Sequence, residues 1–280
     1  MKAAILAGGG NLPTLAAESL KEKGIETIAI VAPEIRDYET IVDRLGKIVS
    51  KVHLSGLGKV GKTLKILKKE KVTHVLMIGK FDKTVLEGRL SPDLRAIWLL
   101  FTLKDRNNDT FHFKIVEILE KRGITTMSQS EVLDKIVPQA GTFTKAKADK
   151  SIMEDIAFGY NVASELGRID VGQTVVVKKK NVMAVESAEG TDATITRGCK
   201  LANGGAVVVK AAKPTQDPRF DLPVVGMDSF KAVVENGGKV IAVEADKTLI
   251  VGLDDCIKYA NDNDIVFLAF TQDELKAYKK

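Results

Sequence analysis

The residues best suited to chemistry lie in one short stretch, residues 213–226, which sets charged groups of both signs between three prolines. Two cations, Lys213 and Arg219, alternate with two carboxylates, Asp217 and Asp221, within nine residues. Hard divalent cations bind carboxylate oxygens, and phosphoryl oxygens bind lysine or arginine. The stretch therefore indicates a site for a metal ion and a phosphate together. An ordinary salt-bridged surface turn is the alternative, because short motifs of this kind often occur by chance.

A second polar cluster, residues 186–192, follows a strand-like run and carries the acids Glu186, Glu189 and Asp192. Gly190 permits a tight turn, Thr191 offers a hydroxyl, and Asp192 can cap a helix or bind a metal. A helix cap alone would account for one acid and leave the others without a role. We therefore expect the cluster to contribute to the same site.

A run of glycines, Gly8, Gly9 and Gly10, followed by Asn11, separates the first predicted strand from a helix with Pro13 near its first turn. This arrangement places backbone N–H groups at a helix N-terminus, where anions bind, and lets a phosphate or sugar approach closely. The run lacks the GxGxxG spacing, and no acid ends the second strand, so NAD binding is disfavoured. A plain tight turn is the alternative.

Gly79 and Lys80 stand just after another predicted strand. In a parallel sheet, ligands bind at the carboxyl ends of the strands. A lysine there is placed to reach an anionic substrate.

Residues 56–63 match the phosphate-loop pattern GxxxxGK[ST] literally. A nucleotide triphosphatase of this class also needs an apolar strand that ends in an aspartate to hold magnesium, and no such strand is evident. We interpret Gly61 and Lys62 as the start of a lysine-rich amphipathic helix, with a phosphate-loop enzyme as the alternative.

The first half of the chain alternates short β-branched runs with amphipathic helical patterns. Strands are predicted at residues 3–7, 27–31, 48–54 and 74–78, and helices at 12–23, 39–45, 60–71, 92–103 and 108–122. This alternation is typical of right-handed βαβ units and a parallel sheet.

The pattern breaks at residues 138–150, where a turn-rich segment precedes a lysine-rich, unpatterned one. We expect a Rossmann-like domain over residues 1–138 and a distinct mixed α/β domain over residues 139–280. In the second domain, helices are predicted at 152–166, 230–236 and 256–263. A β-hairpin is predicted at 174–185, and strands at 206–210, 240–243, 248–251 and 265–269.

Composition narrows the class of protein. The 280 residues are 45% hydrophobic and 28% charged, as in globular proteins, and the net charge of +5 favours anionic partners. Aromatic residues are 5%, too few for base-stacking platforms, and no nucleic-acid motif occurs. Cys199 and Cys256 have no metal-ligand spacing. No signal peptide or membrane span is evident, so we expect a cytoplasmic protein, with peripheral contact to the inner face of the membrane left open.

In order along the chain, several segments resemble the LpxI-type UDP-2,3-diacylglucosamine pyrophosphatases. The resemblance covers nearly the whole chain, and its last two segments are the most specific. The segments are residues 6–13, 58–62, 79–80, 155–159, 170–173, 184–192 and 213–226.

The resemblance implies a homodimer with a ligand cleft between a Rossmann-like domain and a second α/β domain. It implies magnesium-dependent hydrolysis of UDP-2,3-diacylglucosamine to UMP and 2,3-diacylglucosamine 1-phosphate, a step of lipid A synthesis. Asp221 would be the indispensable carboxylate, holding the metal or orienting water, with Asp217 as a second metal candidate. Arg219 and Lys213 would steady the phosphoryl group. The implied substrate contacts are Gly8, Gly9, Gly10, Asn11, Gly79, Lys80, Glu189, Gly190, Thr191, Asp192 and Gln216.

Two other classes of function stay open from the sequence. One is a protein that binds or hydrolyses another nucleotide-sugar in a host without lipid A. The other is a triphosphatase or kinase that uses residues 56–63.

Overall fold

The structure, a computed structural model, describes residues 1–80, 91–97 and 108–278. These residues form two compact units, Met1–Leu133 and Asp134–Lys280, each treated by itself below. The split falls a few residues before the predicted boundary at 138. Among the described residues, no helix combines the length and the hydropathy that crossing a membrane requires.

The first unit is built on a fully parallel sheet with the order β3-β2-β1-β4-β5. Its strands are β1 (Lys2–Ala7), β2 (Glu26–Val31), β3 (Lys51–Leu54), β4 (His74–Ile78) and β5 (Thr125–Thr126). The central strands are nearly continuous apolar runs, as expected where helices cover both faces of a sheet. The predicted Rossmann-like fold class is confirmed.

The described helices of this unit are α1 (Leu12–Glu22), α2 (Tyr38–Gly46), α3 (Val60–Lys69), α6 (Asn108–Glu120) and α7 (Gln129–Val132). The helix predicted at 92–103 lies in large part outside the described residues. The strand order reverses between β1 and β4, and the carboxyl ends of these two strands form the topological switch point where ligands of such folds bind.

The second unit contains a mixed sheet with the order β6-β13-β11-β9-β7-β8. The strands are β6 (Gly141–Thr142), β7 (Thr174–Lys178), β8 (Asn181–Val185), β9 (Ala206–Lys210), β11 (Gly238–Glu244) and β13 (Val266–Phe270). Strands β9, β11 and β13 are parallel, and β7 runs antiparallel to both β8 and β9. The predicted hairpin is confirmed: Lys179 and Lys180 both have positive φ, the requirement of a type I′ turn.

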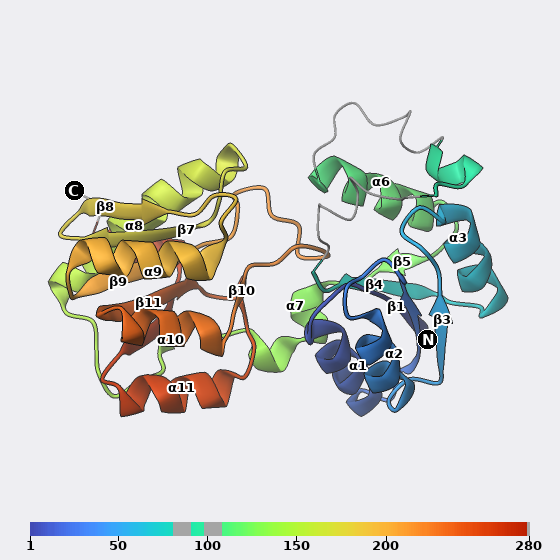
Figure 1. Ribbon diagram of the computed structural model, residues 1–280, viewed down its shortest axis with the longest axis horizontal. Helices are drawn as coiled ribbons and strands as arrows, with labels where there is room; N and C mark the ends of the chain where they lie inside the picture. Colours follow the sequence, from blue (N-terminus) through green and yellow to red (C-terminus); the bar gives the residue numbers. More distant parts are fainter. Residues whose placement is uncertain (81–90, 98–107, 279–280) are drawn as a thin grey trace. The chain divides into compact units, whose positions relative to one another are not determined.

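Helices cover both faces of this sheet (Figure 1). Helix α8 (Lys150–Arg168) packs on one face with α12 (Gln272–Lys276), and the other face carries α9 (Thr191–Ala202), α10 (Met227–Glu235) and α11 (Leu253–Asp262). Because side chains alternate along a strand, Val175 and Val177 face α8 whereas Val176 faces α9. Strands β10 (Val224–Val225) and β12 (Leu249–Ile250) form a separate pair, and a 3-10 turn, η1, spans Asp134–Ile136.

Several sequence predictions need correction. The lysine-rich segment read as unpatterned up to residue 150 ends in a helix cap: the Asp149 side chain accepts a hydrogen bond from Ile152 N, and α8 begins at Lys150. Helix α9 was not predicted at all. The strand predicted at 248–251 pairs with β10 and not with the main sheet.

Candidate active site

The two glycine segments of the first unit meet at the switch point of its sheet. Gly8 N donates to Ile78 O at 2.8 Å, and Gly9 and Lys80 exchange backbone hydrogen bonds of 2.7 and 2.9 Å. A Cβ on Gly8 would lie 2.6 Å from the carbonyl carbon of Gly79, a distance that backbone atoms cannot adjust cheaply. The close approach explains why glycine is needed on both strand ends.

Helix α1 begins directly after this turn. Gly10 has a φ of +86°, which turns the chain, and Pro13 occupies the first turn of the helix. The Asn11 side chain makes no capping hydrogen bond, so it does not occupy the first N–H groups of the helix. The side chain of Lys80 is exposed, although its backbone pairs with that of Gly9. The arrangement suits an anion, and substrate binding by these residues stays a prediction.

The proline-rich loop of the second unit is stiffened by an ion pair. Arg219 donates from Nε to both carboxylate oxygens of Asp217, at 2.9 and 3.1 Å, and from Nη2 at 2.7 Å. Burial would raise the pKa of Asp217, but the hydrogen bonds from Arg219 hold that pKa below its ordinary value. Gln216 donates to the backbone carbonyl of Asp221 at 2.7 Å, which closes the turn between these two residues.

Asp221 stands out from this loop because both of its neighbours are buried. Phe220 and Leu222 are 2% and 6% exposed, whereas the Asp221 side chain is 51% exposed. Its φ of +57° is left-handed, a conformation that aspartate and asparagine tolerate better than most residues. Its carboxylate lies 3.8 Å from the ammonium of Lys213, which also pairs with Asp170 at 2.6 Å.

The acids of residues 186–192 lie around the N-terminus of α9. Gly190, with a φ of +83°, precedes the helix. Glu189 pairs with Arg197 at 2.6 Å, and Asp192 accepts a 2.5 Å hydrogen bond from the Ser229 hydroxyl. Both acids therefore have local partners, and the predicted turn is a helix start held to neighbouring side chains.

A buried lysine that the sequence interpretation missed lies behind this helix start. Lys210, the last residue of β9, is 3% exposed, and its ammonium donates to the hydroxyls of Thr191 at 2.7 Å and Thr174 at 3.1 Å. Burial lowers the pKa of Lys210, and the charges of Glu186, Asp192 and Asp221 act against that shift. The sequence placed Lys210 inside a predicted strand, but the partners of its ammonium lie in other segments and could not be inferred from that strand alone.

Glu186 completes this buried group. Its carboxylate lies 3.8 Å from the Lys210 ammonium and accepts a 2.7 Å hydrogen bond from Thr191. Burial would raise the pKa of Glu186, but the Lys210 charge and hydrogen bonds from Thr174 and Thr191 bring it below its ordinary value. This cluster of polar side chains thus joins four chain positions: the start of β7, the ends of β8 and β9, and the start of α9.

Residues 56–63 lack the arrangement of a phosphate loop. The carboxylate of Asp93 accepts a 2.7 Å hydrogen bond from Gly61 N, and the backbone of Lys62 also stabilises it. Glu34 accepts from Leu57 N at 3.3 Å. Carboxylates of the chain itself therefore engage N–H groups that would have to bind phosphate. The interpretation as a helix start is confirmed by α3, which begins at Val60.

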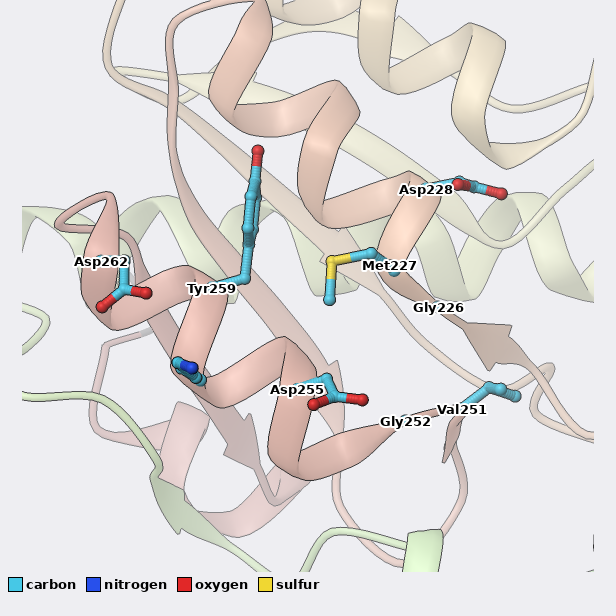
Figure 2. A pocket seen from close by; sticks show the side chains of 9 residues that line it. Gly226, Met227, Asp228, Val251, Gly252, Asp255, Tyr259 and Asp262 are labelled. Carbon is cyan, nitrogen blue, oxygen red and sulfur yellow. The ribbon is translucent and has the colours of Figure 1, made fainter.

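A surface hollow of about 660 Å³ lies elsewhere in the second unit, between the first turn of α10 and the length of α11 (Figure 2). No predicted site residue lines it. Its lining residues are Gly226, Met227, Asp228, Val251, Gly252, Asp255, Lys258, Tyr259 and Asp262.

The acidic loop fits a metal ion less completely than the sequence suggested. Within the part of the chain that the structure describes, no three His, Cys, Asp or Glu residues are grouped closely enough to hold one. Asp217 is a poor ligand because Arg219 engages both of its oxygens. Asp221 presents a half-exposed carboxylate, and Mg²⁺ commonly uses one or two carboxylates together with substrate phosphates. The residues fit such a shared site.

Comparison with known proteins identifies the class. Two family models match successive parts of the chain: the LpxI N-terminal domain matches residues 2–136 and the LpxI C-terminal domain matches residues 139–268. The UDP-2,3-diacylglucosamine pyrophosphatase LpxI of Caulobacter vibrioides is 31% identical over 274 residues, which cover 93% of this chain and 94% of that protein. The chain is thus an enzyme of the hydrolase class. It belongs to the LpxI family, as the sequence predicted.

Similarity to solved structures is weak. Phosphoribosylglycinamide synthetase from Anaerococcus prevotii gives a TM-score of 0.27 at 11% identity, covering 67% of this chain and 39% of that one. A biotin carboxylase–β,γ-ATP complex from Campylobacter jejuni gives 0.27 at 13%, covering 72% and 42%. Similarity at this level supports no conclusion.

Proposed function

We propose that this protein hydrolyses UDP-2,3-diacylglucosamine to UMP and 2,3-diacylglucosamine 1-phosphate in a magnesium-dependent reaction. The observation that carries the proposal is the 31% identity to a UDP-2,3-diacylglucosamine pyrophosphatase over nearly the full length of both proteins. Water adds to one phosphorus atom of the diphosphate and the bridging P–O bond breaks, which leaves the bridging oxygen on the other phosphate. Two protons are released when both phosphomonoester products are fully ionised.

The residues of the acidic loop take separate roles in this proposal. Asp221 supplies the carboxylate that holds the metal or orients the attacking water. Lys213, whose side chain is 13% exposed beside Asp221, offsets phosphate charge. Arg219 keeps the loop rigid through Asp217. A bound Mg²⁺ would neutralise charge on the diphosphate.

Asp221→Asn is the decisive variant. Asparagine has the same shape and tolerates the left-handed backbone, so the loop should keep its fold. We expect UMP release in the presence of Mg²⁺ to fall about 10²–10⁴-fold, the usual contribution of a positioned acid or base. Chelation of the metal should abolish the activity of the unsubstituted protein.

Lys62→Ala is the matched control for the phosphate-loop alternative, and it should leave UMP release unchanged. Loss of triphosphate hydrolysis in Lys62→Ala with an active Asp221→Asn would refute the proposal. Tight binding of the UDP-sugar without product would instead indicate a binding protein.

The homodimer and the contact with the inner face of the membrane belong to the same proposal. Light scattering on the purified protein tests the first. Sedimentation with anionic vesicles tests the second.

A further inference from the structure

Lys210 is a buried charge that the proposed reaction does not use. The charged side chains in the buried set of described residues are Asp155, Lys210 and Glu244. Asp155 accepts hydrogen bonds of 2.8 and 2.6 Å from the hairpin backbone at residues 179 and 180, and Glu244 accepts one of 2.9 Å from Ala212 N. Asp155 thus supports backbone, and Glu244 also accepts from the side chains of Lys247 and Gln272, at 2.9 and 3.0 Å, which are not candidate site residues. The side-chain partners of Lys210, in contrast, belong to the candidate site.

The ammonium of Lys210 joins elements that are far apart in the sequence. Thr174 begins β7, Glu186 follows β8, and Thr191 is the first residue of α9. Thr191 occupies a central place, because its hydroxyl accepts from Lys210 at 2.7 Å and donates to Glu186 at 2.7 Å. The N-terminus of α9 is thereby attached to the sheet edge by one side chain.

Burying an ammonium is costly, and a methionine of similar length would fill the same space without that cost. The charge is therefore better explained by orientation than by stability. Lysine carries three N–H donors on a flexible stem, which lets it satisfy acceptors that come from different elements.

We propose that Lys210 is a positioning residue, whose ammonium fixes Thr191 and the first turn of α9 against the ends of β7 and β8. Residues 189–192 then meet the UDP-sugar in a single arrangement. This inference rests on the proposed function, since it takes that turn as a substrate contact.

Two variants test the positioning role of Lys210, one by removing its ammonium and the other by removing the hydroxyl that it binds. Lys210→Met combined with Glu186→Gln removes the ammonium without leaving a buried unpaired carboxylate, and Thr191→Val removes only the hydroxyl. Both should raise KM for UDP-2,3-diacylglucosamine about tenfold or more, with a smaller change in kcat, because substrate contacts are displaced and the reacting groups remain.

Matched controls exist at the other end of the same helix and on its outer face. Lys178 donates to Ala202 O at 2.6 Å and so secures the opposite end of α9. Lys178→Met, and Thr196→Val on the outer face of α9, should leave KM within about twofold of its original value. If KM rose as much in Lys178→Met as in the Lys210 variant, Lys210 would only stabilise the helix in general. That result would overturn the inference.

Amide exchange supplies a readout that needs no reaction. Residues 190–195 should exchange about tenfold faster in both test variants, while the C-terminal half of α9 keeps its protection. Unchanged exchange there, or an unchanged KM, would contradict the positioning role. If the unsubstituted protein released no UMP, the proposed function would fail, and exchange alone would decide the role of Lys210.

Discussion

At the scale of single residues, the candidate site sets two kinds of charge side by side. Asp221 is held out to solvent between buried Phe220 and Leu222, where its carboxylate is accessible. Lys210 is enclosed, and its charge is compensated by Glu186 and two hydroxyls. The exposed group is suited to chemistry, and the enclosed group is suited to holding the parts in place.

Glu186 gives the buried group a dependence on pH. Its pKa in the folded protein lies below the ordinary 4.5, so the stability it contributes is present above that value and lost as pH falls through the lower folded pKa. Glu186→Gln should remove this contribution and flatten the acid limb of a urea-unfolding series by at most about 1.4 kcal/mol per pH unit. Parallel acid limbs for the two proteins would show that the Lys210–Glu186 pair does not stabilise the fold.

The sequence could indicate the acids of the site but not the lysine that organises them. Asp221 and residues 186–192 lie in short segments whose composition is unusual by itself. The partners of Lys210 are Thr174, Glu186 and Thr191, and these meet only when the sheet of the second unit has formed. Periodicity within one segment carries no information about such a meeting.

At the scale of elements, α9 shows why a helix can go unpredicted from the sequence. Its first half is rich in β-branched residues, which favour strands, and Gly198 interrupts its second half. The packing explains the glycine: a Cβ there would lie 2.5 Å from Cβ of Val176 on β7. The helix therefore approaches the sheet closely because residue 198 has no side chain.

Gly198→Ala should push α9 away from β7. We expect a loss of about 1–3 kcal/mol in the free energy of unfolding, as in other overpacked cores. Thr196→Ala on the outer face of the same helix should change it by less than about 0.5 kcal/mol. Urea unfolding followed by circular dichroism measures both, and equal stability of the two variants would contradict the close packing.

The longer elements were predictable because their periodicity is local. Strands β1, β2, β4, β9 and β13 are unbroken β-branched or apolar runs, and each was found near its observed bounds. The two-residue strands β5, β6 and β10 were missed. A two-residue strand is defined by its pairing with a neighbouring strand. Its own residues therefore do not predict it.

At the scale of the whole molecule, the described chain holds separate cores. Those of the second unit, on either face of its sheet, consist of residues from Asp134–Lys280 alone. The first unit has its own buried strands, among them β1 and β4. Each unit therefore has the means to unfold as a cooperative unit.

Hydrogen exchange followed by mass spectrometry should reveal this division. Gly198→Ala should speed exchange across the second unit and leave the first unit unchanged, because its clash lies with Val176 of the second unit's own core. Gly8→Ala should speed exchange across the first unit and leave the second unit unchanged. Its Cβ would meet the backbone of Gly79 at 2.6 Å within the first unit. If either substitution accelerated exchange in both units alike, the two would form a single cooperative structure, and the separate cores would not define separate folding units.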